Sequence, residues 1–77
     1  MSEDIEVIFL GVNDAGMRVY DWLCNQSGVF VRALLTTKEQ LTVIEDTIPD
    51  LVVSCGFRHI VPEHALSIPD MGCLNLR

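Results

Sequence analysis

Apolar and polar residues follow one another along the chain in short blocks, and the blocks change their spacing at regular intervals. Three nearly continuous apolar runs predict buried strands of a parallel sheet, because such strands are covered on both faces. These runs are Ile5–Leu10, Val29–Leu35 and Leu51–Cys55. A fourth strand is predicted over Met71–Leu76, after the turn residues Ile68, Pro69 and Asp70.

The segments between the strands carry apolar residues at helical spacing. A first helix is predicted from Ala15 to about Gln26, capped by Asn13 or Asp14 and ended by Gly28. Its expected apolar stripe consists of Met17, Val19, Tyr20, Trp22, Leu23 and Cys24.

Two further helices are predicted in the second half of the chain. Thr37 and Gln40 fit a capping box at the start of one helix, which Pro49 ends. Its expected apolar face is Leu41, Val43, Ile44 and Ile48. A short helix is expected over Pro62–Leu66, with Pro62 at the first helical position.

The resulting order, β-α-β-α-β-α-β, predicts a three-layer α/β fold with a parallel sheet. With 77 residues the chain is expected to form one small domain over residues 1–77. Ligands of such sheets bind beyond the carboxyl ends of the strands. The residues expected there are Gly11 to Asp14, Thr36 and Thr37, Gly56 to Val61, and Asn75 to Arg77.

Composition narrows the classes of function. Hydrophobic residues make up 49% of the chain, which favours a packed core over disorder. The net charge is −6 and the five Lys and Arg residues do not cluster, so no basic patch for nucleic acid is expected. No apolar run approaches the ~20 residues of a membrane span. The cysteines, Cys24, Cys55 and Cys73, form no Cys-x-x-Cys pair and are expected to be buried, reduced thiols of a cytoplasmic protein.

The loop after the first strand has the setting of a dinucleotide fingerprint but not its residues. In Gly11-Val12-Asn13-Asp14-Ala15-Gly16 the middle glycine is replaced by Asn13, whose side chain obstructs a pyrophosphate. The second strand ends in Thr36 and Thr37, with no carboxylate for a ribose hydroxyl. Nicotinamide or flavin binding is therefore not expected, although backbone N–H groups at the helix start remain available to an anion.

Histidine, serine and cysteine offer few catalytic candidates. His59 lies in the loop at the ligand edge and is a candidate site residue, whereas His64 is expected on the surface. Their spacing does not place a metal pair on one helical face, so no metal site is predicted. Ser54 and Cys55 are interpreted as packing residues, since no nucleophile elbow surrounds them.

Asn75 is the last candidate, near the end of the fourth strand. An amide side chain there offers both a donor and an acceptor, and it is costly to bury without partners. It is either a functional group at the top of the sheet or a residue that caps the strand and begins a turn.

Three segments together resemble a known family. The segments IEVIFLG, PDLVVSCGFRHIVPEHAL and IPDMGCLNL are similar to the N-terminal half of the folate-dependent formyltransferases, which act on methionyl-tRNA, glycinamide ribonucleotide or amino sugars. The resemblance implies a partial Rossmann-like sheet. It also implies transfer of a formyl group from 10-formyltetrahydrofolate, the co-substrate, to an amine acceptor.

The resemblance assigns roles to residues. Asn75 matches the catalytic Asn of the family's Asn-x-His motif. The loop residues Gly56, Phe57, His59, Ile60 and Val61 match the segment that lines the pterin pocket. Arg77 stands at the position of the catalytic His, and the Asp further along has no counterpart, so we expect a truncated domain with little activity alone.

An alternative of a different class remains open at this point. The chain can be a small non-enzymatic interaction module that associates with itself or another chain through the open sheet edge after Leu76. Coding sequence for His-Pro-Ser-Leu-Leu-Pro beyond Arg77 favours the enzyme, and a stable folded oligomer favours the module.

Overall fold

A computed structural model describes residues 4–57 and 61–76, and it contains one four-stranded sheet. The strands are β1 (Ile5–Leu10), β2 (Val29–Leu35), β3 (Leu51–Cys55) and β4 (Cys73–Leu76). Every neighbouring pair is parallel, and the spatial order is β2-β1-β3-β4. The α/β class and the bounds predicted for the first three strands are confirmed, and the sheet is compatible with a partial Rossmann-like fold.

The strand order creates a switch point between β1 and β3. The chain moves outward from β1 to β2, then crosses back to place β3 on the other side of β1. The carboxyl ends of β1 and β3 therefore send their loops in opposite directions, which is where ligands of open α/β sheets bind. In the register, Leu10 lies beside both Leu35 and Ser54, and Ser54 lies beside Asn75.

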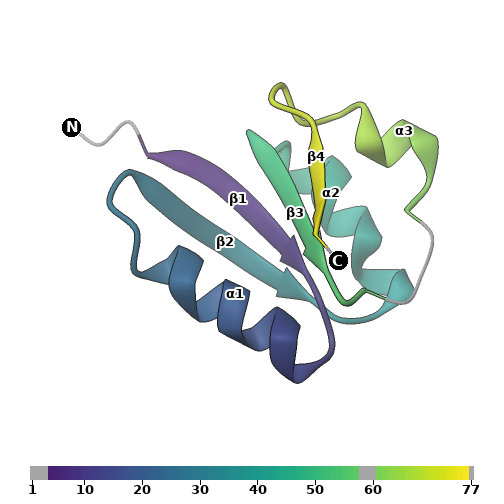
Figure 1. Cartoon of the computed structure of the whole chain (residues 1–77). Helices are drawn as coiled ribbons and strands as arrows, with labels where there is room; N and C mark the ends of the chain where they lie inside the picture. The colour runs from purple at the N-terminus through teal and green to yellow at the C-terminus, as the bar shows by residue number, and fades with distance from the viewer. Residues whose placement is uncertain (1–3, 58–60, 77) are drawn as a thin grey trace.

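Helices cover the sheet on both faces (Figure 1). Helix α1 (Asp14–Cys24) lies on one face. The 3-10 turn η1 (Lys38–Leu41), α2 (Thr42–Thr47) and α3 (Glu63–Leu66) lie on the other. The chain thus has the predicted three layers.

Alternate residues of the strands supply two cores. On the α1 face, the buried residues are Val7, Phe9, Leu23, Val53 and Cys55. On the α2 face, they are Ile8, Leu10, Leu35, Leu41, Ile44, Val52 and Ala65. The ring of Phe9 also contacts that of Tyr20, with 5.9 Å between the centroids. The continuous apolar runs of the sequence are explained by this burial on both faces.

The apolar stripe of α1 is narrower than predicted. Trp22 is 60% exposed and Cys24 is also exposed, because each lies about 100° around the helix from the buried Leu23. The helix begins at Asp14 and ends at Cys24, short of Gln26. The prediction of three buried thiols is correspondingly wrong for Cys24, since only Cys55 is buried and Cys73 is half-buried; all three are free.

The second helix also departs from the prediction. It is divided into η1 and α2, and Ile48 is not part of its apolar face but is 67% exposed. Ile48 adopts a left-handed conformation, with φ of 51°, and its N–H donates to the Ile44 carbonyl. The helix cannot continue because Pro49 follows directly. At the start, the Gln40 side chain accepts from the N–H groups of Thr36 and Thr37.

The last two elements start later than predicted. Strand β4 begins at Cys73 rather than Met71, because Gly72 has a φ of 89° and its N–H closes a turn onto the Pro69 carbonyl. Pro62 precedes α3 with extended backbone (ψ of 147°) instead of forming its first helical residue. Within the described ranges, no helix has the length and apolar character needed to cross a membrane.

Candidate functional site

The carboxyl edge of the sheet gathers the segments that the sequence marked for function. The described residues there include the loop from Gly11 to Asn13, which follows β1, and Gly56, which follows β3. Asn75 lies near the end of β4. These segments come from neighbouring strands, but they differ in how tightly they are packed.

The ends of β1 and β3 meet in a closely packed cluster, here called the glycine junction: Gly11, Asn13, Gly16, Cys55 and Gly56. A Cβ atom at Gly11 or at Gly16 would lie only 2.6 Å from the Cys55 carbonyl oxygen. A Cβ at Gly56 would lie 2.5 Å from Oδ1 of Asn13, and Gly56 also has a φ of 76°. These contacts bring the loop after β1, the first turn of α1 and the end of β3 together.

The side chain of Asn13 contacts two other residues of the glycine junction at the start of α1. Its Oδ1 accepts a hydrogen bond of 2.8 Å from the N–H of Gly16, as expected for a helix N-cap. The same amide group lies against Gly56. The side chain therefore lies at the switch point, at the position where a dinucleotide fingerprint has its middle glycine.

Asn75 is exposed, as Asn13 is, but unlike Asn13 its side chain forms no hydrogen bond with another described residue. It lies on the α2 face of β4, in register with Ser54 of β3. The donor and the acceptor of its amide are thus accessible to a ligand from that face.

The loop residues predicted to line a pterin pocket have different positions. Gly56 belongs to the glycine junction and directly follows Cys55, which is in register with Leu76. Phe57 and Val61 are half-buried and pack against the core on the α2 face. His59 and Ile60 lie outside the described residues, as does Arg77. The structure therefore brings Gly56 and Asn75 to adjacent strand ends, with Phe57 and Val61 supporting the same side.

The remaining candidates from the sequence differ in how deeply they are buried. Ser54 and Cys55 are buried within β3, as predicted for packing residues, and His64 is exposed on α3. Partial burial raises the pKa of the Cys73 thiol above its usual value, so this cysteine has little thiolate at neutral pH. In the described part of the chain, no group of three or more His, Cys, Asp and Glu side chains is arranged to hold a metal ion.

One group of residues was not singled out from the sequence. Lys38, Glu45 and His64 line a cleft between η1, α2 and α3, although 26 positions separate the first from the last in the sequence (64 − 38). Only the packing of α3 against α2 reveals it, because no spacing motif connects the three residues.

No protein-family model matches this chain, and a search of curated proteins found no match either.

Proposed function

We propose that the chain is the N-terminal part of a folate-dependent formyltransferase domain, with 10-formyltetrahydrofolate as co-substrate and an amine as acceptor. One observation carries the proposal: Asn75 is exposed at the carboxyl edge of β4, beside the end of β3 from which the Gly56 loop begins. The segment GFRHIV and the strand end LNL are the two parts of the sequence that resemble the family's pterin loop and its catalytic Asn.

In the proposed reaction, the acceptor amine attacks the formyl carbon and its lone pair forms the new C–N bond. The electrons of the C=O bond move onto oxygen, and the Asn75 amide N–H donates a hydrogen bond to the oxyanion. Collapse of the intermediate expels N10 of tetrahydrofolate, which takes up the proton that the amine loses. A single oxyanion donor of this kind contributes about 100-fold or more to the rate in a closed site.

The proposal also predicts what this chain does not do by itself. Proton transfer between the amine and N10 requires a group that gains and loses a proton, and Arg77 stands where the family has His. We therefore expect no turnover from the 77 residues alone. We propose methionyl-tRNA or an amino sugar as the acceptor. We place the reaction in the cytoplasm, where the three thiols stay reduced.

A chimera tests the proposal. The segment that begins His-Pro-Ser-Leu-Leu-Pro in a family member is joined after Leu76, and release of tetrahydrofolate from 10-formyltetrahydrofolate is followed with each amine acceptor. We expect turnover that Asn75→Ala lowers by about 100-fold or more. Ser67→Ala, a change at an exposed polar residue of the turn after α3, serves as the matched control and leaves the rate unchanged. A folded chimera without turnover, or one indifferent to Asn75→Ala, contradicts the proposal.

A second candidate function is strand pairing through β4. Among the described strands, β4 lies at one edge of the sheet, and its Leu74 is 49% exposed. Exposed apolar edges favour pairing with another strand. Sedimentation of the chain at increasing concentration tests this function: a dimer that Leu74→Lys dissociates supports the interaction module, and a monomer at all concentrations excludes self-association.

A further inference from the structure

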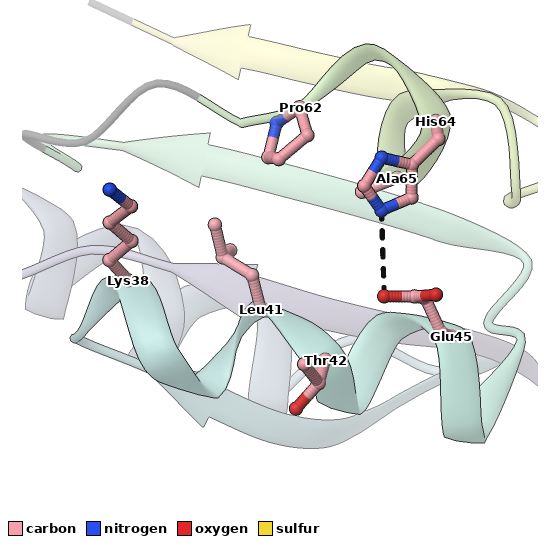
Figure 2. A pocket seen from close by; sticks show the side chains of 7 residues that line it. All are labelled: Lys38, Leu41, Thr42, Glu45, Pro62, His64 and Ala65. Atoms are coloured by element: carbon pink, nitrogen blue, oxygen red, sulfur yellow. Dashed lines mark ion pairs between the residues drawn. The ribbon is translucent and has the colours of Figure 1, made fainter.

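The faces of η1, α2 and α3 that meet on one side of the sheet leave a cleft of about 160 Å³ (Figure 2). We propose that this cleft binds a small organic monocarboxylate with a short apolar chain. The proposal is independent of formyl transfer, because it uses neither Asn75 nor the loop after β3.

The cleft has an apolar centre. Leu41 and Ala65 line it and are themselves almost completely buried, and Pro62 contributes its ring from the segment before α3. Leu41 comes from η1 and Ala65 from α3, and both are held in place because they belong to the same buried core cluster. An apolar cavity of about 150 Å³ accommodates a benzene-sized molecule, so about six carbon atoms fit here.

The two ends of the cleft differ in charge. Lys38, the only lysine of the chain, stands at one end (Figure 2), and no carboxylate of the described residues is paired with it. At the other end, Nε2 of His64 lies 3.5 Å from Oε2 of Glu45. Thr42 contributes little polarity, because its hydroxyl is directed to the Glu39 carbonyl of the preceding turn.

The positions of the charged groups and of the apolar surface in the cleft determine which class of ligand it can bind. A single ammonium group provides one positive charge and no guanidinium fork, which suits a monocarboxylate better than a phosphate dianion. Glu45 disfavours a second negative charge at the far end. We therefore expect the carboxylate to pair with Lys38 and the carbon chain to pack against Leu41, Pro62 and Ala65. Hexanoate has the appropriate size.

Titration of the ¹⁵N-labelled full chain with hexanoate tests the proposal by NMR. We expect saturable shifts of the amides of Lys38, Leu41 and Ala65, with a dissociation constant on the order of 1 mM. Lys38→Gln weakens binding at least about threefold, through loss of the charge-assisted hydrogen bond. Arg18→Gln, which removes one exposed positive charge from α1 on the opposite face, leaves the affinity unchanged.

One alcohol and one amine with the same six-carbon chain as hexanoate complete the experiment. We expect 1-hexanol and hexylammonium to bind more weakly than hexanoate. The proposal is overturned if these analogues bind as tightly as hexanoate, if the shifts lie away from the cleft, or if the Lys38 and Arg18 variants lose affinity equally.

Discussion

At the carboxyl edge of the sheet, the ends of the neighbouring strands β3 and β4 differ in how tightly they are packed. At the glycine junction, the end of β3 is packed so closely against the loop after β1 and the first turn of α1 that a methyl group at Gly11 or Gly16 would lie 2.6 Å from the Cys55 carbonyl oxygen. One strand further along, Asn75 is exposed near the end of β4, and its amide has no partner among the described residues. Close backbone packing with a helix-capping side chain indicates a structural role, whereas a polar group without a hydrogen bond beside a rigid support indicates a binding role.

The largest expected effect comes from adding one carbon atom to the junction. In Gly11→Ala, the new Cβ meets both the Cys55 carbonyl oxygen at 2.6 Å and the Phe9 ring at 2.9 Å. We expect a loss of about 3 kcal/mol in the free energy of unfolding, measured by urea denaturation. Gly28→Ala is the control: its φ of 80° strains an alanine, but nothing lies within 4 Å, so about 1 kcal/mol is expected. Equal losses would show that the junction is not tightly packed.

The alkylation rates of two cysteines compare the glycine junction with the β4 edge in the protein without substitutions. Cys55 is buried in the junction, and Cys73 is half-buried at the β4 edge. We expect iodoacetamide to alkylate Cys73 at least about tenfold faster than Cys55, because Cys55 reacts only after local opening. Because partial burial raises the pKa of Cys73, its thiolate fraction at neutral pH is low and its rate increases as the pH rises through that pKa. Faster reaction of Cys55, followed by mass spectrometry, contradicts the comparison.

Removal of the Asn13 side chain tests the polar part of the junction. Asn13→Ala loses the hydrogen bond to the Gly16 N–H and is expected to lower the free energy of unfolding by about 1 kcal/mol. Asn13→Asp keeps an acceptor of the same shape at the N-terminus of α1 and is expected to retain stability. Thermal and urea unfolding of both variants check this, and similar losses in the two would mean that capping is not the reason for the effect.

The smallest expected effect on stability is at Asn75. Because its side chain is exposed and forms no hydrogen bond with another described residue, Asn75→Ala is expected to change the free energy of unfolding by less than about 0.5 kcal/mol. The same urea measurement checks it. A loss as large as that of Asn13→Ala would assign Asn75 to the structure and not to a binding role.

The sequence predicted those parts of the fold where burial is two-sided. The bounds of β1, β2 and β3 agree with the prediction because continuous apolar runs are buried between two helical layers. The errors at Trp22, Ile48 and Met71 all concern residues that are exposed, where no packing enforces the apolar pattern.

Local features of the candidate site could be predicted from the sequence, whereas its long-range contacts could not. Asn13 as the cap of α1 follows from local residue preferences, and this prediction is confirmed. The contact of Asn13 with Gly56 joins residues 43 positions apart (56 − 13), and the α2–α3 cleft likewise depends on tertiary packing. Such long-range contacts have no signal in one sequence.

The central claim is that the β4 edge beside the glycine junction binds a formylated folate through Asn75. The most direct measurement is an NMR titration of the ¹⁵N-labelled full chain with 5-formyltetrahydrofolate, a stable analogue of the co-substrate. We predict saturable shifts at Gly56, Phe57 and Asn75, none at Gly28, and weaker binding by Asn75→Ala. Absence of saturable shifts at these residues, or unchanged affinity in Asn75→Ala, would contradict the claim.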